Sequence, residues 1–154
     1  MPDLITHTTL AYFLTRPQRF KSFRIFFYLG TILPDLLSRP WYIIFPKLYF
    51  YSIAIHTPVF MIVFSLLAIE FFPPFQRKSV FIYLMSGILA HFALDLLQKH
   101  LVTGYYWFFP FSWHSFEIGL FWPETAVNLI PLWIIAVVFT ELVILVWKTR
   151  ESAT

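Results

Sequence analysis

Two ionisable residues interrupt an otherwise apolar segment of this chain. From residue 79 to residue 97 every position except His91 and Asp95 is apolar or small. An ionisable side chain inside a membrane helix costs about 2.5 to 3.5 kcal/mol and persists where it is paired, bound to metal or in contact with water. Residues four positions apart lie about 40° apart around a helix, so both side chains can reach one ion. The segment therefore predicts a buried polar site.

Three further residues of the same chemistry lie in other apolar segments. His7 and Asp35 lie near the predicted outer ends of their helices. His56 lies about two turns into a third predicted helix. Imidazole and carboxylate without thiolate suit zinc first, and manganese or iron as well. Asp35 is the candidate general base, because a carboxylate beside activated water can accept its proton. The predicted ligands of one or two divalent ions are His7, Asp35, His56, His91 and Asp95.

Each of these residues also has a simpler interpretation. The His91–Asp95 pair could instead fix helix packing through a hydrogen bond, without any ion. The position of His7 also suits a residue at the membrane interface. The run His56, Thr57, Pro58 can cap or break a helix.

The composition indicates an integral membrane protein of one domain, residues 1–154. Hydrophobic residues make up 59% of the chain and charged residues only 12%, against about 25% charged residues in soluble domains. Mean hydropathy is +0.72. The net charge of +3 comes without a basic run or basic helix face, so nucleic acid is not an expected partner. Cysteine is absent and does not inform the compartment.

Hydropathy divides the chain into segments that predict an all-α membrane bundle of about five helices. The third, fourth and fifth have roughly the 20 residues needed to cross the hydrocarbon core, whereas the first two are shorter. The expected helices cover residues 4–14, 23–37, 50–72, 79–97 and 126–147.

Basic residues predict the orientation of these helices. They cluster in three regions that the positive-inside rule places in the cytoplasm: Arg16, Arg19, Lys21 and Arg24; Arg77 and Lys78; Lys148 and Arg150. The N-terminus and the loops 38–49 and 98–125 then lie outside. The candidate ligands fall at the outer ends of their helices, so we expect a multi-pass protein of the plasma (inner) membrane with its site facing outside, towards the periplasm.

Five sequence stretches carry a resemblance to a known family. They read PDLITHTTLAYFL, LGTILPDLL, IHTPVF, and GILAHFALDLL followed by GYYWFFPFS. Their order gives His, Gly-x-x-x-Pro-Asp, His, and then His-x-x-x-Asp. From about Asp3 to Ser112 the chain resembles the membrane-bound, LexA-regulated metal-dependent hydrolases, which are distantly related to zinc-dependent phospholipase C and P1-type nucleases.

This resemblance implies a phospholipase C/P1 nuclease-like core and the same five metal ligands. It also implies that Asp95 can bridge two ions. The phospholipase relatives hold a further ion through two histidines and a glutamate. Here the available residues for such a second cluster are His100, His114, Glu117 and Glu124, and His100 can join the first site only if its helix ends before it.

The expected function is hydrolysis of a phosphoester, lipid or lipid-linked, at the outer leaflet. A bound divalent ion would activate water and polarise the phosphoryl group. Two alternatives belong to other classes. A transporter would use the same groups to bind a passing cation or relay protons, and a non-catalytic adaptor would use them only to hold its helices together. The oligomeric state stays open.

Overall fold

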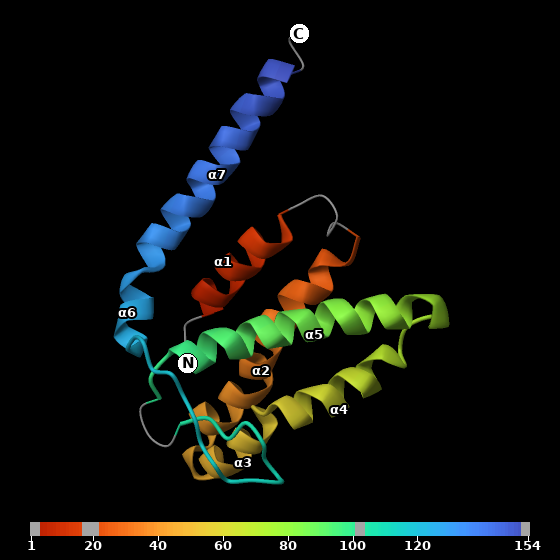
Figure 1. Cartoon of the computed structure of the whole chain (residues 1–154), viewed down its shortest axis with the longest axis vertical. Helices are drawn as coiled ribbons and strands as arrows, with labels where there is room; N and C mark the ends of the chain where they lie inside the picture. Colours follow the sequence, from red (N-terminus) through yellow and green to blue (C-terminus); the bar gives the residue numbers. More distant parts are fainter. Residues whose placement is uncertain (1–3, 17–21, 101–103, 152–154) are drawn as a thin grey trace.

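The computed structural model describes residues 4–16, 22–100 and 104–151, and this part of the chain is helical (Figure 1). It has no β-strand in the described ranges, apart from an isolated bridge between Gln98 and Phe121. The all-α prediction is confirmed. The elements are α1 (Leu4–Thr15), α2 (Arg24–Ile44), the short 3-10 helix η2 (Pro46–Leu48), α3 (Tyr49–Ile55), α4 (Pro58–Ile69), α5 (Pro74–Leu97), α6 (Pro123–Asn128) and α7 (Ile130–Glu151).

Two helical units in the described part of the chain are long and apolar enough to cross a membrane. They are α5 and the continuous stretch Pro123–Glu151, which joins α6 to α7. A third span is formed if Pro46–Ile55 and Pro58–Ile69 count as one broken unit, because these two pieces meet at 70°. The candidate spans therefore fall in the three segments that the hydropathy predicts.

The expectation of one unbroken helix over residues 50–72 is wrong. Proline has no backbone N–H and disfavours the helical conformation in the residue before it. Thr57 accordingly adopts an extended conformation, with φ −129° and ψ 150°, and its side chain accepts a hydrogen bond from the Phe60 backbone N–H at 3.4 Å. His56 therefore lies at the break between α3 and α4, as the alternative interpretation of this run allowed.

Helix α2 is longer than the predicted segment 23–37. It continues to Ile44 through both Pro34 and Pro40. An internal proline removes one backbone hydrogen bond and usually kinks a helix without ending it. The predicted loop 38–49 is therefore mostly helical, and its first residues extend the face that carries Asp35.

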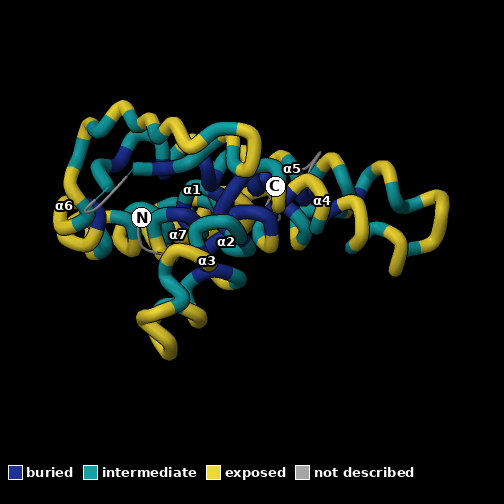
Figure 2. The backbone as a smooth tube through the Cα atoms, turned by 90° about the horizontal axis from the view of Figure 1, so that it is seen from below, coloured by how far each residue is buried: buried dark blue, intermediate teal, exposed yellow. Residues whose placement is uncertain are grey.

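The centre of the molecule is the crossing of α2 and α5, where buried residues concentrate (Figure 2). Gly30 and Gly87 meet there with no side chain between them. A Cβ atom at Gly87 would overlap the Phe27 carbonyl oxygen, and one at Gly30 would overlap the Leu84 carbonyl oxygen. This close approach places the backbone of Thr31 beside His91.

The segment after α5 folds back over the end of that helix. The backbone N–H groups of Ile118 and Leu120 donate to the carbonyls of Leu96 and Leu97, at 2.8 and 2.7 Å. Beyond it, α7 extends away from the other helices (Figure 1), and none of its residues is buried. Its apolar side chains are therefore available to lipid.

Candidate metal centre

The structure brings all five predicted ligands together at one buried place. His7 comes from α1, Asp35 from α2, His56 from the break between α3 and α4, and both His91 and Asp95 from α5. All five residues are buried. Within the described chain they form two overlapping groups, His7 with Asp35 and His91, and His56 with His91 and Asp95, whose ligand atoms lie within 4.8 Å of one another. These groups could hold a metal ion.

The distances in the second group resemble those between ligands of one ion. Zinc bonds of 2.0–2.1 Å in a tetrahedron imply ligand atoms about 3.3 Å apart. The Nε2 atom of His91 lies 3.3 Å from Asp95 Oδ2 and 3.4 Å from His56 Nε2. The third distance, from His56 Nε2 to Asp95 Oδ2, is 2.7 Å, which is that of a direct hydrogen bond. The strongest direct pairing of Asp95 is therefore with His56 on another element, not with His91.

A backbone carbonyl fixes the orientation of the His91 ring. Its Nδ1 lies 2.8 Å from the Thr31 carbonyl oxygen. Because a carbonyl oxygen only accepts, Nδ1 must carry the hydrogen. The lone pair of neutral His91 is then on Nε2 and faces Asp95 and His56. Metal-binding histidines are commonly oriented in this way through their second nitrogen.

Ser38 orients His56 by a related contact. Its hydroxyl donates to the Pro34 carbonyl oxygen at 2.7 Å, which uses its only hydrogen. The same oxygen lies 3.3 Å from His56 Nδ1 and can therefore only accept from it. Nε2 of the same ring lies 2.7 Å from Asp95 Oδ2, the distance of a hydrogen bond in which Nε2 donates to the carboxylate.

These contacts gather the ligand atoms of His56, His91 and Asp95 around one point. Neutral His91 has no hydrogen on Nε2, so a hydrogen from His56 Nε2 or a metal ion must face this lone pair. His7 adds to this demand, because neither of its ring nitrogens has a hydrogen-bond partner in the described structure. Its ring stacks on His91 with centroids 4.0 Å apart, and its Nε2 lies 3.8 Å from Asp95 Oδ1.

Several groups that support the centre were not predicted as part of it. Arg39 forms an ion pair with Asp35 one helical turn away and is 25% exposed at its side chain. The sequence offers a signal for this pair, because Asp35 and Arg39 have the same i,i+4 spacing as His91 and Asp95. The predicted topology places Arg39 in the loop 38–49, however, and not on the helix that carries Asp35. No local sequence pattern predicts the roles of Thr31 and Ser38. Thr31 contacts His91 on α5, and Ser38 contacts His56 at the break between α3 and α4.

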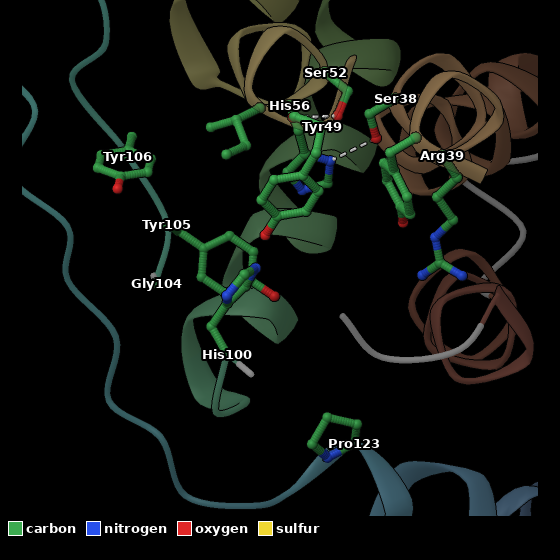
Figure 3. Close-up of a pocket in the computed structure, with 12 residues that line it drawn as sticks. Ser38, Arg39, Tyr49, Ser52, His56, His100, Gly104, Tyr105, Tyr106 and Pro123 are labelled. Atoms are coloured by element: carbon green, nitrogen blue, oxygen red, sulfur yellow. Dashed lines mark hydrogen bonds between the residues drawn. The ribbon is translucent and has the colours of Figure 1, made fainter. Parts of the chain in front are cut away.

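A cavity of about 320 Å³ lies beside the centre and shares His56 with it (Figure 3). Arg39, Tyr49, Tyr105 and His100 are among its lining residues. The hydroxyl of Tyr105 is buried and has no hydrogen-bond partner in the described structure. Burial, reinforced by the negative charges of Asp95 and Asp35, raises the pKa of Tyr105, so this hydroxyl remains a hydrogen-bond donor at neutral pH.

The residues considered for a second cluster do not form one in the described part of the chain. Helix α5 ends at Leu97, so His100 does reach the cavity. Its backbone N–H donates to Glu117 Oε2 at 2.8 Å, and His114 is exposed on the loop. Among the described residues, neither His100 nor His114 belongs to a group of three side chains that could bind one metal ion. The same holds for Glu117 and Glu124.

Comparison with protein-family models, with curated proteins and with solved structures finds no match for this chain.

Proposed function

We propose that this protein is a membrane-embedded, metal-dependent hydrolase that acts on a phosphoester. The observation that carries the proposal is the convergence of His56, His91 and Asp95, whose buried ligand atoms lie 2.7 to 3.4 Å from one another. A divalent ion would stabilise these buried groups by pairing with the carboxylate and the imidazole lone pairs. The resemblance to the LexA-regulated hydrolases supplies the reaction class and a phospholipase C/P1 nuclease-like core by analogy.

The geometry favours one ion over two. His91 belongs to both possible ligand groups, and its Nδ1 is occupied by the Thr31 carbonyl. Only Nε2 remains for a metal, so the two groups cannot each hold an ion through His91. Zinc is the first choice for this nitrogen and oxygen set, with manganese or iron as the other fitting metals.

The roles of the protein groups follow from their positions. A divalent ion in such a site supplies activation of water and polarisation of a phosphoryl oxygen. Asp35 Oδ1 has no hydrogen-bond partner in the described structure and lies 3.9 Å from His56 Nδ1. It is placed to accept a proton from a reacting water. Tyr105 can donate a hydrogen bond to a substrate in the cavity, and Asp95 holds His56 in place.

The membrane context supports a substrate that is a lipid or is linked to one. His91 and Asp95 lie in the last two turns of α5, next to the loop that the positive-inside rule places outside. Arg77 stands at the other end of the same helix, and Lys148 and Arg150 lie in the last turn of α7. A multi-pass protein of the plasma (inner) membrane in this orientation would hold its site at the headgroup level of the outer leaflet.

Elemental analysis and a screen of lipid products test this proposal together. The purified wild-type protein should contain about one divalent ion per chain and release a phosphoester product. Asp95→Ala should lose both, because the carboxylate contacts His56 and His91 directly. His114→Ala should keep both, since His114 is exposed outside the centre.

Two other results would contradict the proposal. Wild-type protein without a bound ion would indicate that the buried groups only hold helices together, as in an adaptor. Metal-dependent ion flux in liposomes without any lipid turnover would indicate transport.

A further inference from the structure

The cavity beside the metal centre has one permanent positive charge. Arg39 is the only lysine or arginine among the described residues that line it. Figure 3 shows its side chain with those of Tyr49, Ser52 and His56 around the same space. A guanidinium group has five N–H donors in a rigid planar arrangement that matches the oxygens of a phosphate as well as those of a carboxylate.

The charges of the centre determine what this cavity can attract. Asp35 and Asp95 carry two negative charges against the single positive charge of Arg39, so the ligand set without an ion has a net charge of minus one if the histidines are neutral. A divalent ion changes that balance to plus one. The metal-loaded centre should therefore attract an anion, and removal of the Arg39 charge should cancel this attraction.

Asp35 connects the arginine to the centre. Its carboxylate pairs with Arg39, and one of its oxygens lies within 4.8 Å of ligand nitrogens of His7 and His91. Only the Asp35 carboxylate would then separate a group bound to Arg39 from the ligand atoms of the centre. This is close enough for a phosphate to contact Arg39 and the ion through different oxygens.

The remaining lining of the cavity suits the organic part of a phosphoester. Tyrosine rings and apolar groups form much of the wall, and Ser38 and Ser52 add hydroxyls near His56. The buried hydroxyl of Tyr105 has no hydrogen-bond partner in the described structure and offers one donor. The volume of about 320 Å³ is at the lower end of the range for small-molecule sites.

We propose that Arg39 is the phosphate-binding residue of this cavity, which takes the phosphoryl group of a phosphoester and a small organic group attached to it. This inference rests on the proposed metal-dependent function. It places the anion-binding residue on α2. Asp35, on the same helix, pairs with Arg39 and also belongs to the proposed ligand set.

Phosphate binding can be measured without turnover. Zinc-loaded protein in detergent is titrated against inorganic phosphate and followed by broadening of the ³¹P resonance, with zinc content measured on the same sample. We expect Arg39→Gln to weaken phosphate binding about 10-fold to 100-fold, because a charge-assisted hydrogen-bonded contact is lost. Arg77→Gln is the matched control, since Arg77 also pairs with a carboxylate, that of Glu70, but lies about 27 Å along α5 from Asp95.

Arg39→Lys separates phosphate binding from support of Asp35. Lysine keeps the charge beside Asp35 but not the planar donors, so it should retain zinc and bind phosphate with intermediate affinity. Wild-type phosphate affinity in Arg39→Gln at full zinc content would overturn the inference. So would loss of zinc in both variants, because Arg39 would then act only by positioning Asp35. Protein that binds zinc and phosphate but hydrolyses no ester would contradict the proposed function and leave this inference intact.

Competition identifies the source of the phosphoryl group. Short-chain phosphatidic acid and glycerol phosphate carry the same group with and without acyl chains. Preferential displacement of inorganic phosphate by the first supports a lipid substrate, and by the second a water-soluble ester. Displacement by neither would overturn the assignment of an ester to the cavity.

Discussion

At the scale of single residues, the hydroxyl of Ser38 decides which nitrogen of His56 faces Asp95. It donates to the Pro34 carbonyl oxygen at 2.7 Å, so it can only accept from His56 Nδ1. The Thr31 carbonyl oxygen has the same effect on His91. Two ordinary polar contacts thereby direct both Nε2 atoms towards one carboxylate, where they could bind one metal ion.

Ser38→Ala tests this role without changing any candidate ligand. Loss of the acceptor for His56 Nδ1 should lower zinc affinity about 10-fold, as is usual when a ligand loses its orienting partner. Competition with a chromogenic chelator measures the change. Ser65→Ala is the matched control, because Ser65 is also fully buried but its hydroxyl has no hydrogen-bond partner in the described structure. Equal zinc affinity in the two variants would show that Ser38 does not orient His56.

At the scale of elements, the crossing of α2 and α5 sets the register of the centre. Gly30 and Gly87 allow the two backbones to touch, and this contact places Thr31 of α2 against His91 of α5. The break at Thr57 and Pro58 has a comparable effect, because it leaves His56 outside a regular helix and lets it reach Asp95. Both devices depend on residues that have no metal chemistry of their own.

Gly87→Ala should therefore affect stability and metal binding together. The added methyl group would overlap the Phe27 carbonyl oxygen and force α2 away from α5. Overpacking of this kind usually costs about 1–3 kcal/mol, so the thermal unfolding midpoint in detergent should fall. Zinc affinity should fall as well, as the Thr31 carbonyl moves from His91.

Ser86→Ala provides the control for that experiment, because Ser86 is the exposed neighbour of Gly87 on the same helix. It should leave both the unfolding midpoint and the zinc affinity unchanged. A Gly87→Ala protein with lowered stability but normal zinc affinity would indicate that the crossing does not position His91.

At the scale of the whole molecule, the exposed apolar surface favours association with a membrane. Helix α7 has no buried residue, and its C-terminal part extends away from the remaining helices. Glu141, within this helix, pairs with Arg16 at 2.8 Å and accepts a hydrogen bond from Tyr12 at 2.6 Å. These polar contacts attach α7 to α1, while the rest of its surface is suited to lipid.

The absence of cysteine makes the proposed orientation directly testable. A single cysteine introduced by His114→Cys should react with a membrane-impermeant maleimide in intact cells, because this loop is predicted to lie outside. One introduced by Thr149→Cys should react only after permeabilisation, since the positive-inside rule places the basic end of α7 in the cytoplasm. Both positions are exposed. The reverse labelling pattern would contradict an outward-facing site.

The sequence by itself determined the class of the protein and the identity of the groups that meet. Composition indicated membrane helices, and the i,i+4 spacing of His91 and Asp95 placed both on one helix face, because helix geometry is local. The other three candidates followed from ionisable residues in the remaining apolar segments, and the resemblance implied the same five ligands. Pro58 also indicated the break near His56, although the expectation of one helix over residues 50–72 did not use it.

Only the tertiary structure decided how these groups face one another. The contact of His56 with Asp95, the orientation of His91 by Thr31 and the position of Arg39 at the cavity all depend on how helices cross or on where a broken helix turns. Such arrangements depend on side chains and backbone from distant segments, and no periodicity along a single helix encodes them. The chemistry of the residues is local in the chain, whereas their function as one site is a property of packing.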